Sequence, residues 1–206
     1  MQGRSLPQEL RYRPAQNQLL LRVKRLEGRP STIRIDHRFR WLRELMNDVF
    51  PAITQHGPSA EIIFDLVPGA DHVRMGLTVA LPLTPTCDVC LDPYPDRLQF
   101  SVDLVCRAAE DMEQDVGALS AGERQYLAED AETIPFTQGE IDLTDICREQ
   151  INLFRPQRFR CRETCLGLCP RCGVNLNRLR CDCTRGDLSA SAWGKLRDYR
   201  PSKKSP

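Results

Sequence analysis

The chain has 206 residues, of which 41% are hydrophobic and 28% are charged. This composition supplies a core and excludes a wholly disordered chain. The absence of a long apolar run and of an apolar N-terminal signal segment predicts a soluble, cytoplasmic protein with no membrane contact. In such a compartment, the ten cysteines stay reduced unless a metal or a catalytic cycle engages them.

The net charge of +1 conceals a segregation of charge along the chain. Residues 1–100 hold 13 basic and 11 acidic side chains, residues 101–154 hold 3 and 13, and residues 155–206 hold 13 and 4. In one interpretation the acidic and basic blocks pair with each other in the fold. In the other, the basic end binds an anionic partner such as RNA.

The first part of the chain reads as strands around one helix. Residues 19–26 favour a strand, and residues 38–50 favour a helix because their apolar positions recur at steps of three and four. Residues 60–67 and 72–83 flank a Pro-Gly turn and predict a β-hairpin. Another strand is expected at residues 98–105, so Cys87 and Cys90 should lie on a loop between two strands.

The remaining elements complete an expected α+β fold, in which a β-rich core domain with a few helices precedes a C-terminal cysteine-rich zinc-binding segment. Residues 108–139 read as an acidic, mobile insert with one short helix near residues 121–130. A helix is expected at residues 141–154, capped by Asp142 or Thr144. The expected domains are an N-terminal extension (1–14), the core (15–156), a cysteine module (157–185) and a basic tail (186–206).

Eight of the ten cysteines occur as close pairs. These pairs are Cys87/Cys90, Cys161/Cys165, Cys169/Cys172 and Cys181/Cys183. Zinc binds four thiolates in a tetrahedron, and a close pair supplies two ligands from one turn. The pairs therefore predict one or two zinc ions. The unpaired Cys106 and Cys147 lie in apolar segments and are expected in the core.

The assignment of pairs to ions rests on spacing. Cys169-Pro-Arg-Cys172-Gly173 is a knuckle in which Gly173 permits a positive φ, and Cys181 and Cys183 follow closely. A Cys-x-Cys in a strand points its sulfurs to opposite faces, so these two either turn at Asp182 or serve different ions. The other two pairs then form a second site across the fold. Alternatively, a single site forms and the remaining cysteines are ordinary thiols.

Other cysteine chemistries match less well. Cys165, Cys169 and Cys172 have the spacing of a radical SAM iron–sulfur motif, but only 34 residues follow, too few for the required barrel. Rubredoxin-like iron uses similar knuckles, and a thioredoxin-like role would need a βαβ unit. The three histidines form no catalytic metal pattern, and four-thiolate sites are closed, so no enzymatic activity is expected.

Three stretches resemble the YceD family of bacterial and plastid proteins, over roughly residues 15–185. They are Cys87-Asp-Val-Cys90-Leu, Gly139-Glu-Ile-Asp-Leu143 leading to Arg148-Glu149, and Leu168-Cys-Pro-Arg-Cys-Gly-Val-Asn-Leu-Asn177 ending in Cys181-Asp-Cys183. The resemblance implies a role in making or accumulating large-subunit ribosomal RNA and implies no enzymatic activity.

The leading hypothesis is a non-catalytic zinc-binding assembly factor that binds ribosomal RNA, a large-subunit ribosomal protein, or both, with no small-molecule substrate. Its candidate phosphate contacts are Arg155, Arg158, Arg160, Arg162, Arg171, Arg178, Arg180 and Arg185. Arginine outnumbers lysine 25 to 4 throughout the chain, so only the clustering near the cysteines favours RNA. The acidic residues 108–132 would shield the basic end. The alternative is a thiol-based redox or zinc sensor.

Overall fold

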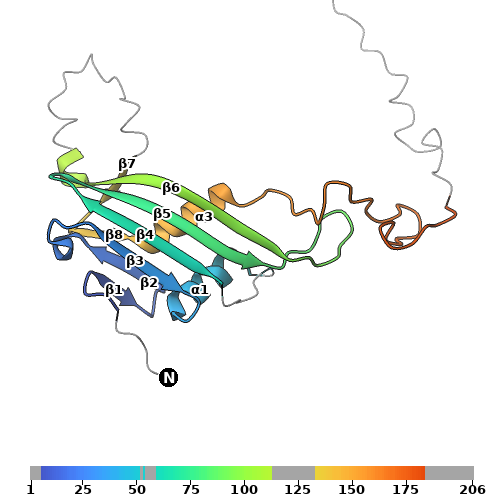
Figure 1. Ribbon diagram of the computed structural model, residues 1–206, viewed down its shortest axis with the longest axis horizontal. Coiled ribbons are helices and arrows are strands. Elements are labelled where there is room, and N and C mark those ends of the chain that lie inside the picture. Colours follow the sequence, from blue (N-terminus) through green and yellow to red (C-terminus); the bar gives the residue numbers. More distant parts are fainter. Residues whose placement is uncertain (1–5, 52, 54–58, 113–132, 184–206) are drawn as a thin grey trace, which may run out of the picture.

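The computed structural model describes residues 6–51, 53, 59–112 and 133–183. The elements are β1 (Leu10–Arg13), β2 (Gln18–Arg22), the 3-10 helix η1 (Val23–Leu26), β3 (Ser31–Asp36), α1 (Arg40–Val49), β4 (Glu61–Pro68), β5 (His72–Leu83), β6 (Asp96–Ala108), β7 (Thr133–Phe136), β8 (Glu140–Asp142) and α3 (Leu143–Phe154). The larger sheet has strand order β3-β4-β5-β6-β7, and the smaller has β1-β2-β8. Helices α1 and α3 lie on one face of the larger sheet (Figure 1). This confirms the predicted α+β class.

The hairpin of β5 and β6 forms a long arm. The two strands pair from His72 opposite Arg107 to Leu83 opposite Asp96, and β5 buries every second residue against the core. The predicted hairpin of β4 and β5 is also confirmed, with the Gly69 amide donating to the His72 carbonyl at its turn. Because β5 and β6 are long, their loop projects beyond the rest of the larger sheet (Figure 1).

The core lies between the larger sheet and the two helices. The apolar face of α1 is fully packed, with Trp41, Leu42 and Leu45 completely buried. Helix α3 contributes further buried side chains, and its Cys147, like Cys106 of β6, has no exposed surface. The expectation that these two cysteines belong to the core is confirmed.

A buried hydroxyl joins the smaller sheet to both helices. Thr144 Oγ1 accepts hydrogen bonds from Trp41 Nε1 at 2.9 Å and from the Leu19 amide at 2.8 Å. Asp142, the residue before the first residue of α3, caps this helix: its Oδ1 accepts a hydrogen bond from the Thr144 amide. Asp142 is one of the two caps predicted from the sequence. These contacts fix the start of α3 against β2 and α1, and the chain that leaves the other end of α3 leads to the cysteines.

Three local predictions differ from the structure. The strand predicted at residues 19–26 ends at Arg22, because residues 23–26 form η1 and the Val23 amide donates to the Gly139 carbonyl; Glu27, with a φ of 49°, then ends η1. The smaller sheet also takes β1 from the segment expected as an N-terminal extension. Helix α3 starts at Leu143, since residues 140–142 form β8.

Part of the segment predicted as a mobile insert is ordered. Strand β7 pairs in parallel with the end of β6, and its Ile134 and Phe136 pack against the core. The short helix predicted near residues 121–130 lies outside the described residues. Within the described ranges, no helix is long and apolar enough to cross a membrane.

Candidate metal centres

All eight paired cysteines gather in two groups of four. The first cysteine cluster consists of Cys87, Cys90, Cys161 and Cys165, and the second of Cys169, Cys172, Cys181 and Cys183. Within each cluster every sulfur lies within 4.8 Å of the others. The sulfurs of Cys181 and Cys183 both belong to the second cluster, so this pair is not divided between two sites.

The first cluster joins the tip of the arm to the chain that follows α3. Figure 1 shows residues 155–183 running from α3 past the loop between β5 and β6. At the junction, the Asp88 amide donates to the Phe159 carbonyl and the Phe159 amide donates to Asp88 Oδ2, both at 2.8 Å. The two segments are thus held together by backbone contacts as well as by the cysteines.

A close approach of two backbones completes this junction. Leu168 donates to the Val89 carbonyl at 3.2 Å, beside Gly167 with its φ of 74°. A side chain at position 167 would place its Cβ 2.8 Å from Val89 Cγ1 and 2.9 Å from the Val89 oxygen. Gly167 is therefore required both by its backbone conformation and by its contact.

The two clusters are built on the same turn. In the first knuckle (residues 87–92), the Cys87 amide donates to the Asp92 carbonyl and the Leu91 amide donates to the Cys87 carbonyl, both at 2.9 Å. In the second knuckle (residues 169–174), Cys169 and Gly173 make the equivalent bonds at 2.8 and 2.9 Å. The residue after the second cysteine has a positive φ in both, 61° at Leu91 and 71° at Gly173.

The sulfur positions suit one tetrahedral metal ion per cluster. Cys87 Sγ lies 3.9 Å from Cys165 Sγ, and Cys90 Sγ lies 3.8 Å from Cys161 Sγ. A tetrahedron with metal–sulfur bonds of about 2.3 Å has edges of about 3.8 Å. All ten cysteines are free of disulfides. Each cluster can therefore hold a metal ion, and four sulfur donors leave no open coordination position.

Hydrogen bonds favour the thiolate form at the first cysteine of each knuckle. Burial acts to raise the pKa of Cys87, but bonds from the backbone at Cys161 and Cys90 lower it to about 6. Bonds from the backbone at Cys172 and Arg171 likewise lower the pKa of Cys169 to about 6. Thiolates are the form that binds metal.

The core cysteines show the opposite effect. Burial alone raises the pKa of the Cys106 thiol to about 12, and burial also raises the pKa of Cys147. No hydrogen bond in the described part of the chain lowers either value. These two residues therefore remain neutral thiols within the core.

Two asparagines near the clusters were not predicted as functional. Asn177 Nδ2 donates to Cys165 Sγ at 3.4 Å, and Asn175 Nδ2 donates to Asp92 Oδ2 at 2.7 Å. Both residues lie between ligands of the second cluster and contact the first. The signal available in the sequence was the Asn-Leu-Asn stretch after Gly173, whose role depends on contacts with residues far away in the chain.

The comparisons with known proteins agree with this cysteine arrangement. The sequence profile of the family "Large ribosomal RNA subunit accumulation protein YceD" matches residues 75–199, more than half of the chain. The chain belongs to the YceD family. The matched region starts in β5 and includes both cysteine clusters, whereas the strands and helix before β5 lie outside it.

One curated relative has a related name. The "Large ribosomal RNA subunit accumulation protein YCED homolog 1, chloroplastic" of Arabidopsis thaliana is 35% identical over 66 residues. The alignment covers 31% of this chain and 21% of the relative, so the chain spans about a fifth of the length of that protein. No solved structure matches.

Several of the predicted RNA-binding arginines contact this YceD-family chain itself. Arg155 donates to the Val49 carbonyl at 3.5 Å, Arg162 to Asn177 Oδ1 at 2.7 Å, and Arg178 pairs with Asp92 at 3.0 Å. Arg171 also interacts with other protein groups. These side chains are exposed, but part of their hydrogen-bonding capacity is used within the protein: Arg155 bonds to α1, and Arg162 and Arg178 bond to groups around the two cysteine clusters.

Three other predicted arginines are free. The side chains of Arg158, Arg160 and Arg180 are exposed and make no hydrogen bond or ion pair with the described residues. Arg158 and Arg160 precede the first ligand of the module, and Arg180 precedes Cys181. Arg185 lies outside the described part of the chain.

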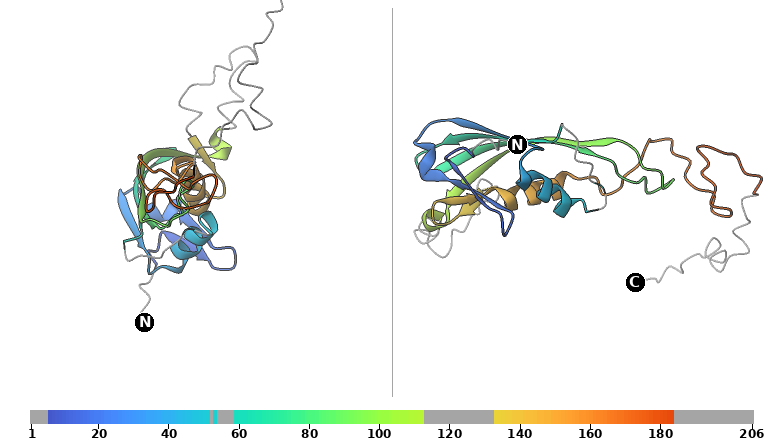
Figure 2. Two further views of the ribbon diagram at one scale, coloured as in Figure 1. Left: turned by 90° about the vertical axis from the view of Figure 1, so that its right-hand side faces the viewer. Right: turned by 90° about the horizontal axis from the view of Figure 1, so that it is seen from below.

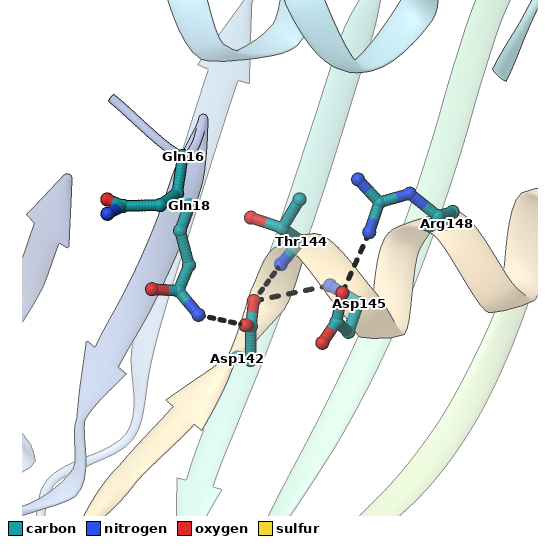
Figure 3. Close-up of a pocket in the computed structure, with 6 residues that line it drawn as sticks. All are labelled: Gln16, Gln18, Asp142, Thr144, Asp145 and Arg148. Carbon is teal, nitrogen blue, oxygen red and sulfur yellow. Dashed lines mark hydrogen bonds and ion pairs between the residues drawn. The ribbon is translucent and has the colours of Figure 1, made fainter. Parts of the chain in front are cut away.

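A small polar hollow lies in the domain, away from the residues of the two cysteine clusters. It has a volume of about 130 Å³ and lies between β2 and the start of α3 (Figure 3). Its side chains bond to one another: Gln18 donates to Asp142, and Arg148 donates to Asp145. Because these groups already have partners, we assign the hollow to the cap of α3 and to no ligand.

Proposed function

We propose that this protein is a non-catalytic zinc-binding factor that supports processing or accumulation of large-subunit ribosomal RNA. The proposal places one zinc ion in each cysteine cluster. The observation that carries it is the closed geometry of four sulfurs per cluster, which suits a structural ion. The family name of the matching profile supplies the biological context.

The metal would shape a surface and take no part in chemistry. Residues 157–183 form no helix or strand, only an isolated β-bridge between Leu168 and Asn175, so metal bonds and the contacts described above replace a hydrophobic core. On this scaffold Arg158, Arg160 and Arg180 supply free guanidinium groups. We propose that they contact phosphates of ribosomal RNA, either alone or together with a large-subunit ribosomal protein.

Metal analysis of the full chain tests the first part. Purified with a slight excess of zinc, the protein should hold two zinc ions, and Cys87→Ser and Cys172→Ser should each hold one. Cys106→Ala, which changes a core cysteine, should still hold two. Iron in place of zinc, or unchanged metal content in both serine variants, would overturn the assignment.

RNA binding tests the second part. A triple variant, R158Q/R160Q/R180Q, should bind large-subunit ribosomal RNA at least tenfold more weakly. The negative slope of log association constant against log salt concentration should become smaller in magnitude by about 2. The matched control is R25Q/R29Q/R38Q, which changes three exposed arginines of the core domain. An equal loss of affinity in both triple variants would mean that the binding is unspecific attraction between charges. No RNA binding by the parent protein would point to a protein partner.

A thiol-based sensor is the second candidate, and one observation favours it. Cys172 of the second cluster is exposed, whereas the cysteines of the first cluster are largely buried. An exposed ligand can be reached by an oxidant. A sensor would lose zinc to mild peroxide within minutes, whereas a structural site would retain it.

A further inference from the structure

The loop that connects the ligands of the second cluster is folded against the first. This loop, residues 173–180, runs from Cys172 to Cys181. Its Leu176 amide donates to the Gly167 carbonyl at 2.9 Å, and its Arg178 pairs with Asp92 of the first knuckle at 3.0 Å. The metal ion that fixes both ends of the loop would therefore also fix the groups that contact the first cluster.

Asn177 makes the most direct contact. Its Nδ2 donates to Cys165 Sγ at 3.4 Å, while its Oδ1 accepts from the Leu166 amide at 2.9 Å and from Arg162 at 2.7 Å. A donor on a ligand sulfur stabilises the thiolate, and the bond to Leu166 holds the backbone next to the ligand. One side chain thus supports both the charge and the position of Cys165.

Asn175 holds Asn177 in place. Its Oδ1 accepts from the Asn177 amide at 3.0 Å and from Asn177 Nδ2 at 2.9 Å, and its own Nδ2 donates to Asp92 and to the Cys90 carbonyl. The two asparagines therefore form a continuous bridge from the second cluster's loop to both halves of the first cluster.

We propose that the two sites bind metal cooperatively, with Asn175 and Asn177 as the positioning residues that couple them. The inference rests on the metal binding proposed above. Occupation of the second site orders residues 173–180 and so presents Asn177 to Cys165. By thermodynamic reciprocity, occupation of the first site stabilises the same loop and strengthens the second site.

A titration of the reduced, metal-free full chain with Co²⁺ against a competing chelator tests the coupling. The absorption bands of tetrahedral cobalt report each four-thiolate site directly. The double variant Cys172→Ser/Cys183→Ser retains only the first site, and its affinity should be 10- to 100-fold lower than that of the first site in the parent, a loss typical of groups that support metal ligands.

Asn177→Asp removes the side-chain donor of the bridge. It keeps an oxygen acceptor for Leu166 and Arg162 but loses the Nδ2 that donates to Cys165 Sγ and to Asn175 Oδ1, so the first site should weaken by about tenfold while both sites still form. In the Cys172→Ser/Cys183→Ser background the same change should have little further effect, because the loop is no longer held. Asn152→Asp, an identical change at an exposed position of α3, is the control.

First-site affinities within twofold of the parent in both the serine and the Asn177→Asp variants would overturn the proposal. An equal loss in Asn152→Asp would overturn it as well, because the effect would then be one of net charge. RNA takes no part in this titration, so these outcomes stay separate from failure of the proposed RNA binding.

Discussion

The two cysteine clusters share one kind of knuckle but differ in how they are assembled. The first joins cysteines that lie 71 to 78 positions apart in the chain and buries three of its four residues. The second uses only residues 169–183, and its Cys172 is exposed. A short loop costs less entropy to close than a long one, so the second cluster is the easier to form. The first is the one that determines tertiary structure.

This difference assigns separate tasks to the two ions. An ion in the first cluster fastens the cysteine module to the arm of β5 and β6, and an ion in the second folds the loop that carries Asn177. Figure 2 shows that the module extends from one end of the domain. The first cluster joins it to the arm, and its Phe159 packs against the core.

The largest expected effect is the difference in proteolysis between a variant that lacks one ligand of the first cluster and a variant that lacks one ligand of the second. Cys87→Ser should release residues 157–183 as a whole, and trypsin should then cut rapidly after Arg158, Arg160 and Arg162. Cys172→Ser should leave those three sites protected and expose only the arginines that follow Cys169. Mass spectrometry of the first fragments distinguishes these results. The same early fragments from both variants would mean that the clusters have equal structural roles.

The next effect concerns the order of metal release. With a chelator in excess, zinc should leave in two phases, because Cys172 gives access to the second ion while the first is enclosed. Cys172→Ser should abolish the fast phase and Cys87→Ser the slow one. The release is measured from the absorbance of the chelator complex. A single phase in the parent chain would contradict the difference in accessibility.

The different ways in which the two cysteine clusters are assembled were only partly predictable from the sequence. Close cysteine pairs and the Pro-Arg-Cys-Gly turn are local patterns, and the helical spacing of α1 and the hairpin turn before His72 are local as well. For this reason those elements were recognised. The grouping of Cys87 with Cys165 followed only after the other pairs had been assigned to each other.

Features that depend on distant contacts escaped prediction. Strand β7 pairs with β6 across more than twenty intervening residues, and its four residues carry no clear alternation. Leu91 adopts a positive φ without being a glycine, because the hydrogen bonds of the knuckle impose it. The roles of Asn175 and Asn177 follow from the approach of two loops, which spacing alone does not reveal.

Two glycines provide a smaller, matched test. Gly167→Ala combines a positive φ with a Cβ 2.9 Å from the Val89 oxygen, and it should weaken the first site by about 2–5 kcal/mol. Gly173→Ala has a similar φ of 71° but nothing within 4 Å of the added Cβ, so the second site should lose only about 1–2 kcal/mol. Competitive zinc titration measures both. Equal losses of zinc-binding free energy at the two sites would mean that Val89 moves aside and removes the close contact with the added Cβ.

The smallest effect should come from relieving the strain at Leu91. Its side chain is 60% exposed and its φ is 61°, so Leu91→Gly removes an unfavourable conformation at little cost in packing. The flexibility of glycine in the unfolded chain offsets part of this gain, leaving a net stabilisation of up to about 1 kcal/mol. The slow phase of zinc release should lengthen. Leu179→Gly, at a residue 62% exposed with no positive φ, should gain nothing. Faster release from Leu91→Gly would show that the leucine side chain stabilises the first knuckle.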